Sequence, residues 1–171
     1  MLAAGEGRRF GGPKAPFVLD DERLVDRAVR ILREAGCDPV VVVLGAWLGE
    51  VPGASIVVNP EWESGMGSSL RSGLRSLGDE VERVLVTLVD LPGLTSEAVR
   101  RVLACDASLA VATYDGERGH PVLLGRPHWS GVIEAAQGDA GARTYLAAHS
   151  ADLALVEVGD VASGEDLDLH D

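Results

Sequence analysis

The sequence predicts an α/β fold, in which a mostly parallel sheet carries helices on both faces. Three short runs, at Pro39–Gly45, Ala54–Pro60 and Arg83–Asp90, are continuously apolar and end in turn signals. Continuous apolar character is typical of strands that are buried on both faces, as in a parallel sheet. Because segments with helical periodicity separate these runs, the alternation of strand and helix indicates right-handed βαβ units.

Three helices are expected between and after these strands. Gly36 is well placed to end the first helix, and Thr95 is placed to cap the third. The second helix follows Ser68, with Ser68 or Ser69 as its cap. Apolar residues recur at helical spacing in all three: Leu24, Ala28, Ile31, Leu32 and Ala35 in the first, Leu70, Leu74 and Leu77 in the second, and Ala98, Val99, Val102 and Leu103 in the third.

The second half of the chain is less regular and predicts an antiparallel addition to the sheet. Residues 109–125 are typical of two strands around a polar turn at Asp115 and Gly116. No internal repeat, linker or low-complexity segment is visible, so we expect one domain over residues 1–171. The other elements expected in this half are helices at about Trp129–Ala136 and Ala142–His149 and a strand at Leu153–Val158.

Both ends of the chain look clipped. The apolar piece Met1–Ala4 is short for a buried strand, and the last residues stop inside the acidic motif EDLDLHD. Two interpretations follow: residues are missing from the chain at its ends, or the first strand is a stub.

The composition argues against several classes of partner. The 171-residue chain is 46% hydrophobic and has a formal net charge of −12. An acidic surface repels nucleic-acid phosphates and anionic membranes, and no apolar run approaches the roughly 20 residues that span a bilayer. The two cysteines, Cys37 and Cys105, lack the C-x-x-C spacing of a zinc site. We therefore expect a cytoplasmic protein without nucleic-acid or membrane partners.

A glycine-rich loop with basic residues follows the first apolar residues, in the stretch MLAAGEGRRFGGPK. Glycines let backbone N–H groups approach a phosphate, and Arg9 and Lys14 would neutralise triphosphate charge. The spacing is not that of a dinucleotide fingerprint, because Phe10 stands at its third glycine. Nor is it that of a P-loop, because Pro13 precedes the lysine. On these residues alone, a surface glycine turn with solvated basic side chains is the other interpretation.

Several motifs, in the same order, resemble the nucleotidyltransferases related to molybdenum cofactor biosynthesis. Their signature is L-A-[AG]-G-x-[SG]-x-R-[FM]-G-x-x-K, and here LAAGEGRRFGGPK occupies residues 2–14. NPEWESGMGSSLRSGL, LVDLPGLT and GHPVLLG follow, and the final DLDLHD is similar to D-[IL]-D-T-P-E-D, with Leu169 and His170 in place of Thr-Pro. The resemblance covers essentially the whole chain. In these motifs it is closest to the CTP:molybdopterin cytidylyltransferases.

The resemblance implies a glycosyltransferase-A-like (Rossmann-like) fold and an Mg²⁺-dependent nucleotidyltransferase. Such an enzyme would move CMP from CTP to a phosphorylated acceptor such as molybdopterin, with release of pyrophosphate. One alternative is a guanylyl- or sugar-phosphate nucleotidyltransferase on the same fold. The other is a non-catalytic nucleotide-binding accessory protein for molybdoenzyme maturation. The resemblance also allows a transient contact with a molybdoenzyme or its chaperone.

Residue chemistry and the family positions together define the candidate site. Lys14 and Arg9 would neutralise the phosphates, and Asp90 follows a buried strand, where α/β sheets place ligand contacts. Asp90 and Asp168 are the expected Mg²⁺ ligands. Without the resemblance, Asp90 is equally well explained as a turn cap and Asp168 as part of a solvated tail. The residues expected to contact the nucleotide are Leu2, Ala3, Ala4, Gly5, Gly7, Lys14, Gly65 and Ser68.

Two further residues carry expectations about substrates. His120 stands in the G-H-P match, which implies the acceptor pocket, although a lone hairpin histidine is usually ordinary turn chemistry. Ala4 precedes the first loop glycine, where the resemblance associates alanine with cytidylyl transfer and glycine with guanylyl transfer. A methyl group beside the base takes up room that a purine would need and a pyrimidine would not.

Overall fold

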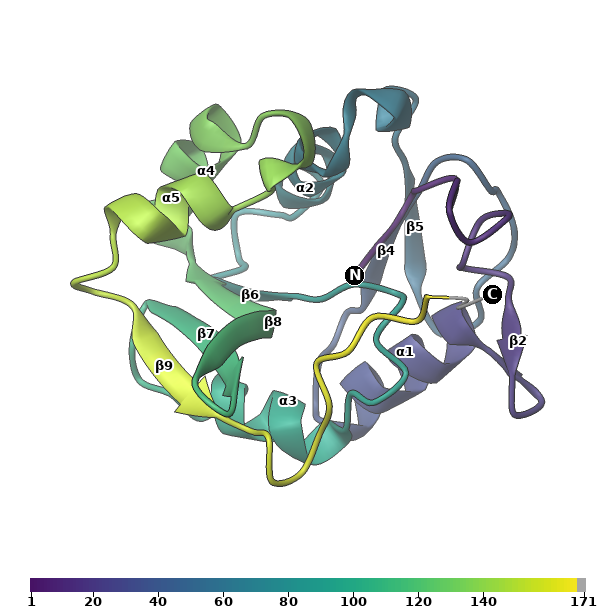
Figure 1. Cartoon of the computed structure of the whole chain (residues 1–171). Coiled ribbons are helices and arrows are strands. Elements are labelled where there is room, and N and C mark those ends of the chain that lie inside the picture. The colour runs from purple at the N-terminus through teal and green to yellow at the C-terminus, as the bar shows by residue number, and fades with distance from the viewer. Residues whose placement is uncertain (169–171) are drawn as a thin grey trace.

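The computed structural model describes residues 1–168 and has a twisted sheet between two layers of helices (Figure 1). In one half of the sheet, β4 (Val41–Leu44) lies between β1 (Leu2–Ala3) and β5 (Ser55–Val58), all parallel. The other half has the order β6 (Arg83–Val86), β8 (Glu117–Gly125), β7 (Leu109–Tyr114) and β9 (Ala154–Glu157). Strand β8 is antiparallel to both of its neighbours, whereas β7 and β9 are parallel. The α/β class and the antiparallel addition are confirmed.

The two halves of the sheet meet where β1 runs beside the residues that follow β6. Leu2 forms a parallel bridge with Leu88. The Leu2 amide donates to the Thr87 carbonyl at 2.9 Å, and the Val89 amide donates to the Leu2 carbonyl at 3.1 Å. This junction brings Asp90 to the edge of the sheet from which the glycine-rich loop starts.

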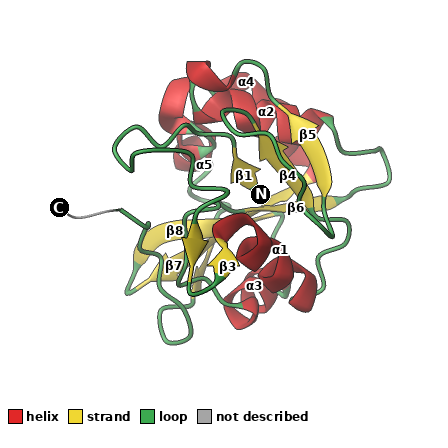
Figure 2. Cartoon of the chain, turned by 90° about the vertical axis from the view of Figure 1, so that its right-hand side faces the viewer, coloured by secondary structure: helices red, strands yellow, loops and turns green. Residues whose placement is uncertain are grey.

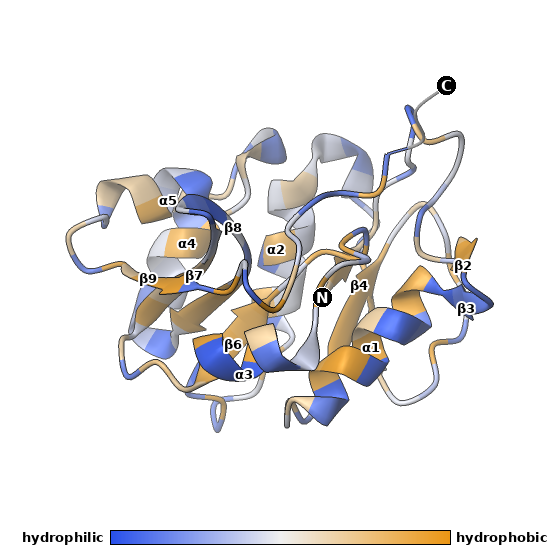
Figure 3. Cartoon of the chain, turned by 60° about the horizontal axis from the view of Figure 1, so that its bottom comes forward, coloured by the Kyte–Doolittle hydropathy of each residue, from blue (hydrophilic) through white to orange (hydrophobic). Residues whose placement is uncertain are grey.

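Helices cover both faces of the sheet, as the sequence predicts (Figures 1 and 2). Residues of α1 (Leu24–Glu34) and α3 (Ser96–Leu103) share one apolar cluster with Val42 and Leu44. Residues of α2 (Met66–Arg75), α4 (Trp129–Ala135) and α5 (Arg143–Ala148) share another with Val43. Successive residues of β4 therefore pack against helices on opposite faces of the sheet. Figure 3 shows that β4 is apolar and that α1 has both hydrophobic and hydrophilic residues.

Short elements connect the main ones. A small hairpin of β2 (Val18–Leu19) and β3 (Glu22–Arg23) precedes α1. Three single turns of 3₁₀ helix are η1 (Trp62–Ser64), η2 (Arg126–His128) and η3 (Gly138–Ala140). None of the helices within residues 1–168 is both long enough and apolar enough to cross a membrane.

Local signals at helix and strand ends agree with the structure in most places. The Thr95 hydroxyl accepts a hydrogen bond from the Ala98 amide at 3.2 Å, so it caps α3. Gly36, with a φ of +95°, follows the end of α1. Asp115 and Gly116 both have positive φ in the turn between β7 and β8, as a tight hairpin requires.

Two local predictions are wrong. Strand β5 is not buried on both faces: it is an edge strand, and Ile56 and Val58 are 39% and 53% exposed. Ser68 and Ser69 do not cap α2, because the helix begins at Met66 with Gly65 as its N-cap residue. The φ of +109° at Gly65 lets the chain turn directly from η1 into α2, so the helix starts before the serines.

Candidate active site

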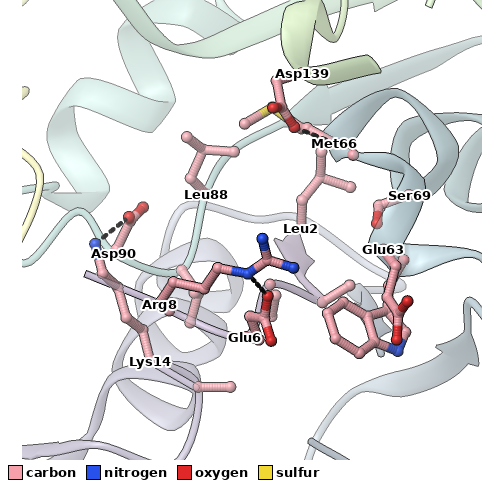
Figure 4. Close-up of a pocket in the computed structure, with 18 residues that line it drawn as sticks. Leu2, Glu6, Arg8, Lys14, Glu63, Met66, Ser69, Leu88, Asp90 and Asp139 are labelled. Atoms are coloured by element: carbon pink, nitrogen blue, oxygen red, sulfur yellow. Dashed lines mark hydrogen bonds and ion pairs between the residues drawn. The ribbon is translucent and has the colours of Figure 1, made fainter. Parts of the chain in front are cut away.

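A cavity of about 440 Å³ opens between the glycine-rich loop and the start of α2 (Figure 4). Its two sides come from different parts of the chain. The glycine-loop wall, from residues 2–15 and 88–90, is lined by Leu2, Ala3, Ala4, Gly5, Glu6, Gly7, Arg8, Lys14, Ala15, Leu88, Val89 and Asp90. The helix wall is lined by Trp62, Glu63, Gly65, Met66, Ser69 and Asp139.

Gly7 sets the shape of the glycine-rich loop. Its φ is +62°, and a β-carbon there would overlap the carbonyl oxygen of Gly12. The Gly7 carbonyl accepts hydrogen bonds from the amides of Phe10, Gly11 and Gly12 at 3.0, 2.9 and 3.1 Å. Within residues 1–168, the amides of residues 5–9 donate no hydrogen bond to the protein. These consecutive unpaired amides at the end of a strand are suited to bind an anion.

Lys14 links the loop to two carboxylates that are distant in sequence. Its ammonium Nζ donates to Asp90 Oδ2 at 2.8 Å and to Asp168 Oδ1 at 3.4 Å. The side chains of Lys14 and Asp90 are only 15% and 20% exposed, whereas that of Asp168 is 55% exposed. The structure therefore brings together three of the residues that sequence analysis selects, with Asp168 on the solvent side.

The electrostatics of this group favour a charged lysine. Burial lowers the pKa of Lys14, but hydrogen bonds and charges from Asp90 and Asp168 outweigh it, so the net pKa is raised. The pKa of Asp166 is also raised, first by burial and then by the charge of Asp90. Sequence analysis does not select Asp166, although it is the first aspartate of the terminal acidic motif.

The segment that follows β9 crosses the molecule to this group (Figure 1), and three contacts hold it in place. Arg101 forms a two-pronged ion pair with Asp160, at 2.6 and 3.0 Å. The Ser163 amide then donates to the Gly93 carbonyl at 3.0 Å, and the Leu167 amide donates to the Asp90 carbonyl at 2.8 Å. The last three residues of the motif, among them Leu169 and His170, lie outside the described residues.

Seven of the eight expected nucleotide contacts line the cavity, whereas Ser68, the phosphate candidate Arg9 and the metal candidate Asp168 do not. Arg9 is exposed and is not a lining residue, whereas its neighbour Arg8 lines the cavity and pairs with Glu6. Ser68 is buried beneath the helix wall, where its hydroxyl accepts from Asn59 Nδ2 at 2.8 Å. Ser69, the next residue, lines the cavity in its place.

His120 also lies outside the lining of the cavity. Burial lowers its pKa to about 4, although the charge of Asp90 acts in the opposite direction and Arg143 reinforces the shift. Its carbonyl accepts a hydrogen bond from the Tyr114 hydroxyl at 2.6 Å. His120 is therefore a neutral side chain in the electrostatic field of both Asp90 and Arg143.

The helix wall contains residues that sequence analysis missed. Trp62, Glu63 and Met66 fall inside the matched motif at residues 59–74 and could have been proposed from it. Asp139 has no such signal, because it reaches the cavity only through the packing of η3 on α2. Its Oδ1 accepts a hydrogen bond from the Met66 amide at 3.3 Å.

The residues beside Lys14 fit a magnesium ion that arrives with a nucleotide. Among residues 1–168, no group of three or more His, Cys, Asp or Glu side chains is placed to hold a metal ion. Asp90 and Asp168 nevertheless converge on the same ammonium. Mg²⁺ in nucleotide sites typically uses one or two carboxylates, with phosphates and waters as its other ligands. Asp90 and Asp168 supply two carboxylates and so fit such a site.

Known proteins resemble this chain over nearly its whole length. A protein named nicotine blue oxidoreductase, from Paenarthrobacter nicotinovorans, is 36% identical over 98% of this chain and 90% of its own. A "Probable molybdenum cofactor guanylyltransferase" of Mycobacterium ulcerans is 28% identical over 95% of this chain and 84% of its own.

A solved structure and a family model also match most of this chain. The crystal structure of a Mycobacterium sp. strain JC1 homologue of a Mycobacterium tuberculosis protein has a TM-score of 0.79. It is 28% identical and covers 98% of this chain and 87% of its own. The model of the MobA-like NTP transferase domain matches residues 1–153. The chain therefore belongs to the MobA-like NTP transferase family and is a nucleotidyltransferase of that family.

Proposed function

We propose that the chain transfers CMP from CTP to a phosphorylated small-molecule acceptor, with molybdopterin as the leading candidate, and releases pyrophosphate. The observation that carries the proposal is the convergence of Lys14, Asp90 and Asp168 beside a run of unpaired loop amides. Unpaired amides and a partly buried ammonium at one end of a cavity can bind the negative charge of a triphosphate. The family membership supports the same class of reaction.

The reaction needs no protein nucleophile. An oxygen of the acceptor phosphate attacks the α-phosphorus and forms a P–O bond, while the bond to the bridging β-phosphate oxygen breaks and pyrophosphate leaves. The protein contributes position and charge. The amides of the loop around Gly5 and Gly7 hold the triphosphate, and Lys14 neutralises charge that develops during transfer. Arg8 shares the role that the sequence gives to Arg9, because it is the arginine that lines the cavity.

Asp90 and Asp168 would hold Mg²⁺, which when bound supplies further positive charge to the phosphates. In the structure, the single positive charge of Lys14 pairs with both carboxylates and leaves a net negative charge on the three side chains. We propose that Lys14 is released toward the phosphates once the carboxylates have another cation. His120 remains the candidate for the acceptor side, because it lies near enough to Asp90 for that charge to act on its pKa.

Ala4 and the named relatives bear on the choice of base. Ala4 lines the cavity and is 5% exposed, which supports CTP through the space its methyl group occupies. The relative named as a guanylyltransferase supports GMP transfer as the alternative. A sugar phosphate as acceptor and a non-catalytic accessory role for molybdoenzyme maturation also remain alternatives.

The relative named nicotine blue oxidoreductase favours a second candidate, a redox enzyme. For this candidate we take a nicotinamide dinucleotide as the cofactor to test in the same cavity. A dinucleotide also carries phosphates that the loop amides and Lys14 could bind. This candidate gives no role to Asp168 as a second carboxylate, so we place it behind nucleotidyl transfer.

The test is release of pyrophosphate from each of the four nucleoside triphosphates, with Mg²⁺ and molybdopterin, in parallel with oxidation of NADPH. We expect release with CTP, and loss of at least about 99% of it in Asp90→Asn. Asp106→Asn is the matched control, because Asp106 is exposed and does not line the cavity. Circular dichroism should be unchanged in both variants.

Each contrary outcome has its own meaning. Turnover by Asp90→Asn close to that of the wild type would remove Asp90 from the site. Nucleotide binding without pyrophosphate release, with either molybdopterin or a sugar phosphate, would overturn the enzyme in favour of an accessory protein. NADPH oxidation without pyrophosphate release would favour the redox candidate.

A further inference from the structure

We propose that Asp139 selects nucleotides whose base carries an exocyclic amino group. The inference rests on the proposed function, because it concerns the opposite end of the same cavity. Asp139 belongs to η3 and lines the helix wall, whereas Lys14 and Arg8 line the glycine-loop wall (Figure 4). Both basic side chains of the cavity lining thus lie on the glycine-loop wall, with Glu6 and Asp90, whereas the charged residues of the helix wall, Asp139 and Glu63, are both acidic.

Backbone packing fixes the place of Asp139. A β-carbon at Gly65 would lie 2.6 Å from the Gly138 carbonyl, and one at Gly67 would lie 2.8 Å from the Ala136 carbonyl oxygen. No side chain therefore fits between the start of α2 and residues 136–138. The Arg71 guanidinium also donates to the Ala136 carbonyl. Because this contact is made by backbone, the segment that carries Asp139 has little room to shift.

A second anchor holds the segment from its other side. Arg143 Nη2 donates to the Asp139 carbonyl at 3.2 Å, and Arg143 Nε donates to the Ala140 carbonyl at 3.3 Å. Both bonds are to main-chain oxygens, one of Asp139 and one of Ala140, so neither occupies the Asp139 carboxylate. The hydrogen bonds from Arg143 thus fix the backbone from which the Asp139 side chain extends.

The Asp139 carboxylate keeps most of its capacity to accept hydrogen bonds. An ionised carboxylate has about four acceptor sites. Oδ1 receives one long hydrogen bond, 3.3 Å from the Met66 amide. In the described part of the chain, Asp139 forms no ion pair with a lysine, arginine or histidine. The acceptor sites that remain are available to a ligand that offers N–H groups.

The charge of the triphosphate determines which part of the ligand meets Asp139. Phosphates are drawn to Lys14 and the loop amides and repelled by a carboxylate, so the base faces the helix wall. A carboxylate accepts from the amino group of cytosine or guanine, and it repels the carbonyl oxygen that uracil carries instead. Asp139 would thus favour CTP over UTP, or GTP over ITP if the base is a purine.

Calorimetric titration of CTP, UTP, GTP and ITP in Mg²⁺ tests the proposal without any need for turnover. The variants are Asp139→Asn and, as a matched control, Glu134→Gln, an exposed acid on α4 that does not line the cavity. Asp139→Asn keeps the contact with α2, because its side-chain amide oxygen can still accept from the Met66 amide. The thermal midpoint of this variant should therefore stay within about 2 °C of the wild type.

If the protein prefers pyrimidines, CTP should bind the wild type at least about tenfold more tightly than UTP. If it prefers purines, the same difference should separate GTP from ITP. In Asp139→Asn the gap should shrink to about threefold or less, because a carboxamide can turn to donate as well as accept. Glu134→Gln should keep the wild-type gap. An unchanged gap in Asp139→Asn, or no gap in the wild type, would overturn the role of Asp139 and leave the proposed function standing. Absence of binding by all four nucleotides would overturn the proposed function itself.

Discussion

The two walls of the cavity are built in different ways. The glycine-loop wall is mostly one continuous stretch, residues 2–15, shaped by a glycine whose backbone no other residue would adopt easily. The helix wall joins Met66 to Asp139, which are 73 positions apart in the chain. A wall of the first kind is specified by local chemistry, and a wall of the second kind by packing between distant segments.

The walls also differ in charge. The first wall carries Lys14 and Arg8 together with Glu6 and Asp90, whereas the charged residues of the second wall, Glu63 and Asp139, are both acidic. We infer that the first wall binds what all nucleoside triphosphates share and that the second distinguishes one base from another. Substitutions in the glycine-loop wall should therefore alter catalysis with every nucleotide. Substitutions in the helix wall should alter the stability of the fold and the preference for one base over another.

The largest effect is expected from Gly65→Ala in the helix wall. Gly65 has a φ of +109° and a ψ of 175°, a region that is essentially limited to glycine, and an added β-carbon would lie 2.6 Å from Gly138. Strain and overlap together should lower the free energy of unfolding by about 3 kcal/mol or more. Urea denaturation measures the loss.

Gly138→Ala is the matched control for that variant. Its φ is also positive, at +52°, but a β-carbon there meets nothing within 4 Å. The cost should be about 1–2 kcal/mol, from the left-handed backbone alone. Equal losses in the two variants would mean that close backbone packing does not hold the helix wall together.

Lys14→Ala tests the glycine-loop wall. If Lys14 stabilises charge that develops during transfer, the variant should lower kcat by at least about a hundredfold, or about 2.7 kcal/mol, with every nucleotide that reacts. Steady-state pyrophosphate release measures both kcat and KM. A change confined to KM would instead make Lys14 a clamp for phosphate in the ground state. Arg8→Ala should cost more than Arg9→Ala, because only Arg8 lines the cavity.

Ala4→Gly asks whether the glycine-loop wall also contributes to choice of base. We expect the wild type to bind CTP more tightly than GTP, and the variant to narrow that gap without reversing it, since one methyl group is worth about 1–3 kcal/mol. Calorimetric titration of both nucleotides in Mg²⁺ measures the two gaps. Tighter binding of GTP by the wild type would contradict the cytidylyl assignment and support the guanylyl alternative.

The smallest effect concerns His120, whose pKa responds to Asp90 of one wall and to Arg143, which anchors the other. Burial lowers the pKa to about 4, below the usual value near 6.5, so the unfolded chain binds the proton more readily. The contribution to stability is therefore complete above pH 6.5 and is lost as the pH falls toward 4. Between pH 7 and 5 the wild type should lose about 1 kcal/mol more than His120→Gln, measured by urea denaturation. Parallel pH profiles would show that His120 is exposed to water.

The contrast between the walls also explains which features could be predicted from the sequence. Continuous apolar runs and helical periodicity identify the strands and helices, because each depends on local patterns. Lys14, Asp90 and Asp168 could be selected because motifs and strand ends carry them. Asp139 could not, since its place depends on how Gly138 packs on Gly65. The motifs point to Arg9 and Ser68, each one residue away from the lining residues Arg8 and Ser69, because a motif does not fix which side chain turns inward.

The nucleotide site itself is tested most directly by calorimetric titration of CTP, with Mg²⁺, against Gly5→Val and Gly12→Val. A β-carbon at either position meets nothing within 4 Å, so both variants should fold, but only Gly5 lines the cavity. If the loop amides and Lys14 bind the triphosphate, the dissociation constant for CTP should rise at least about tenfold in Gly5→Val. In Gly12→Val it should equal that of the wild type. Wild-type affinity in Gly5→Val would contradict this placement of the triphosphate.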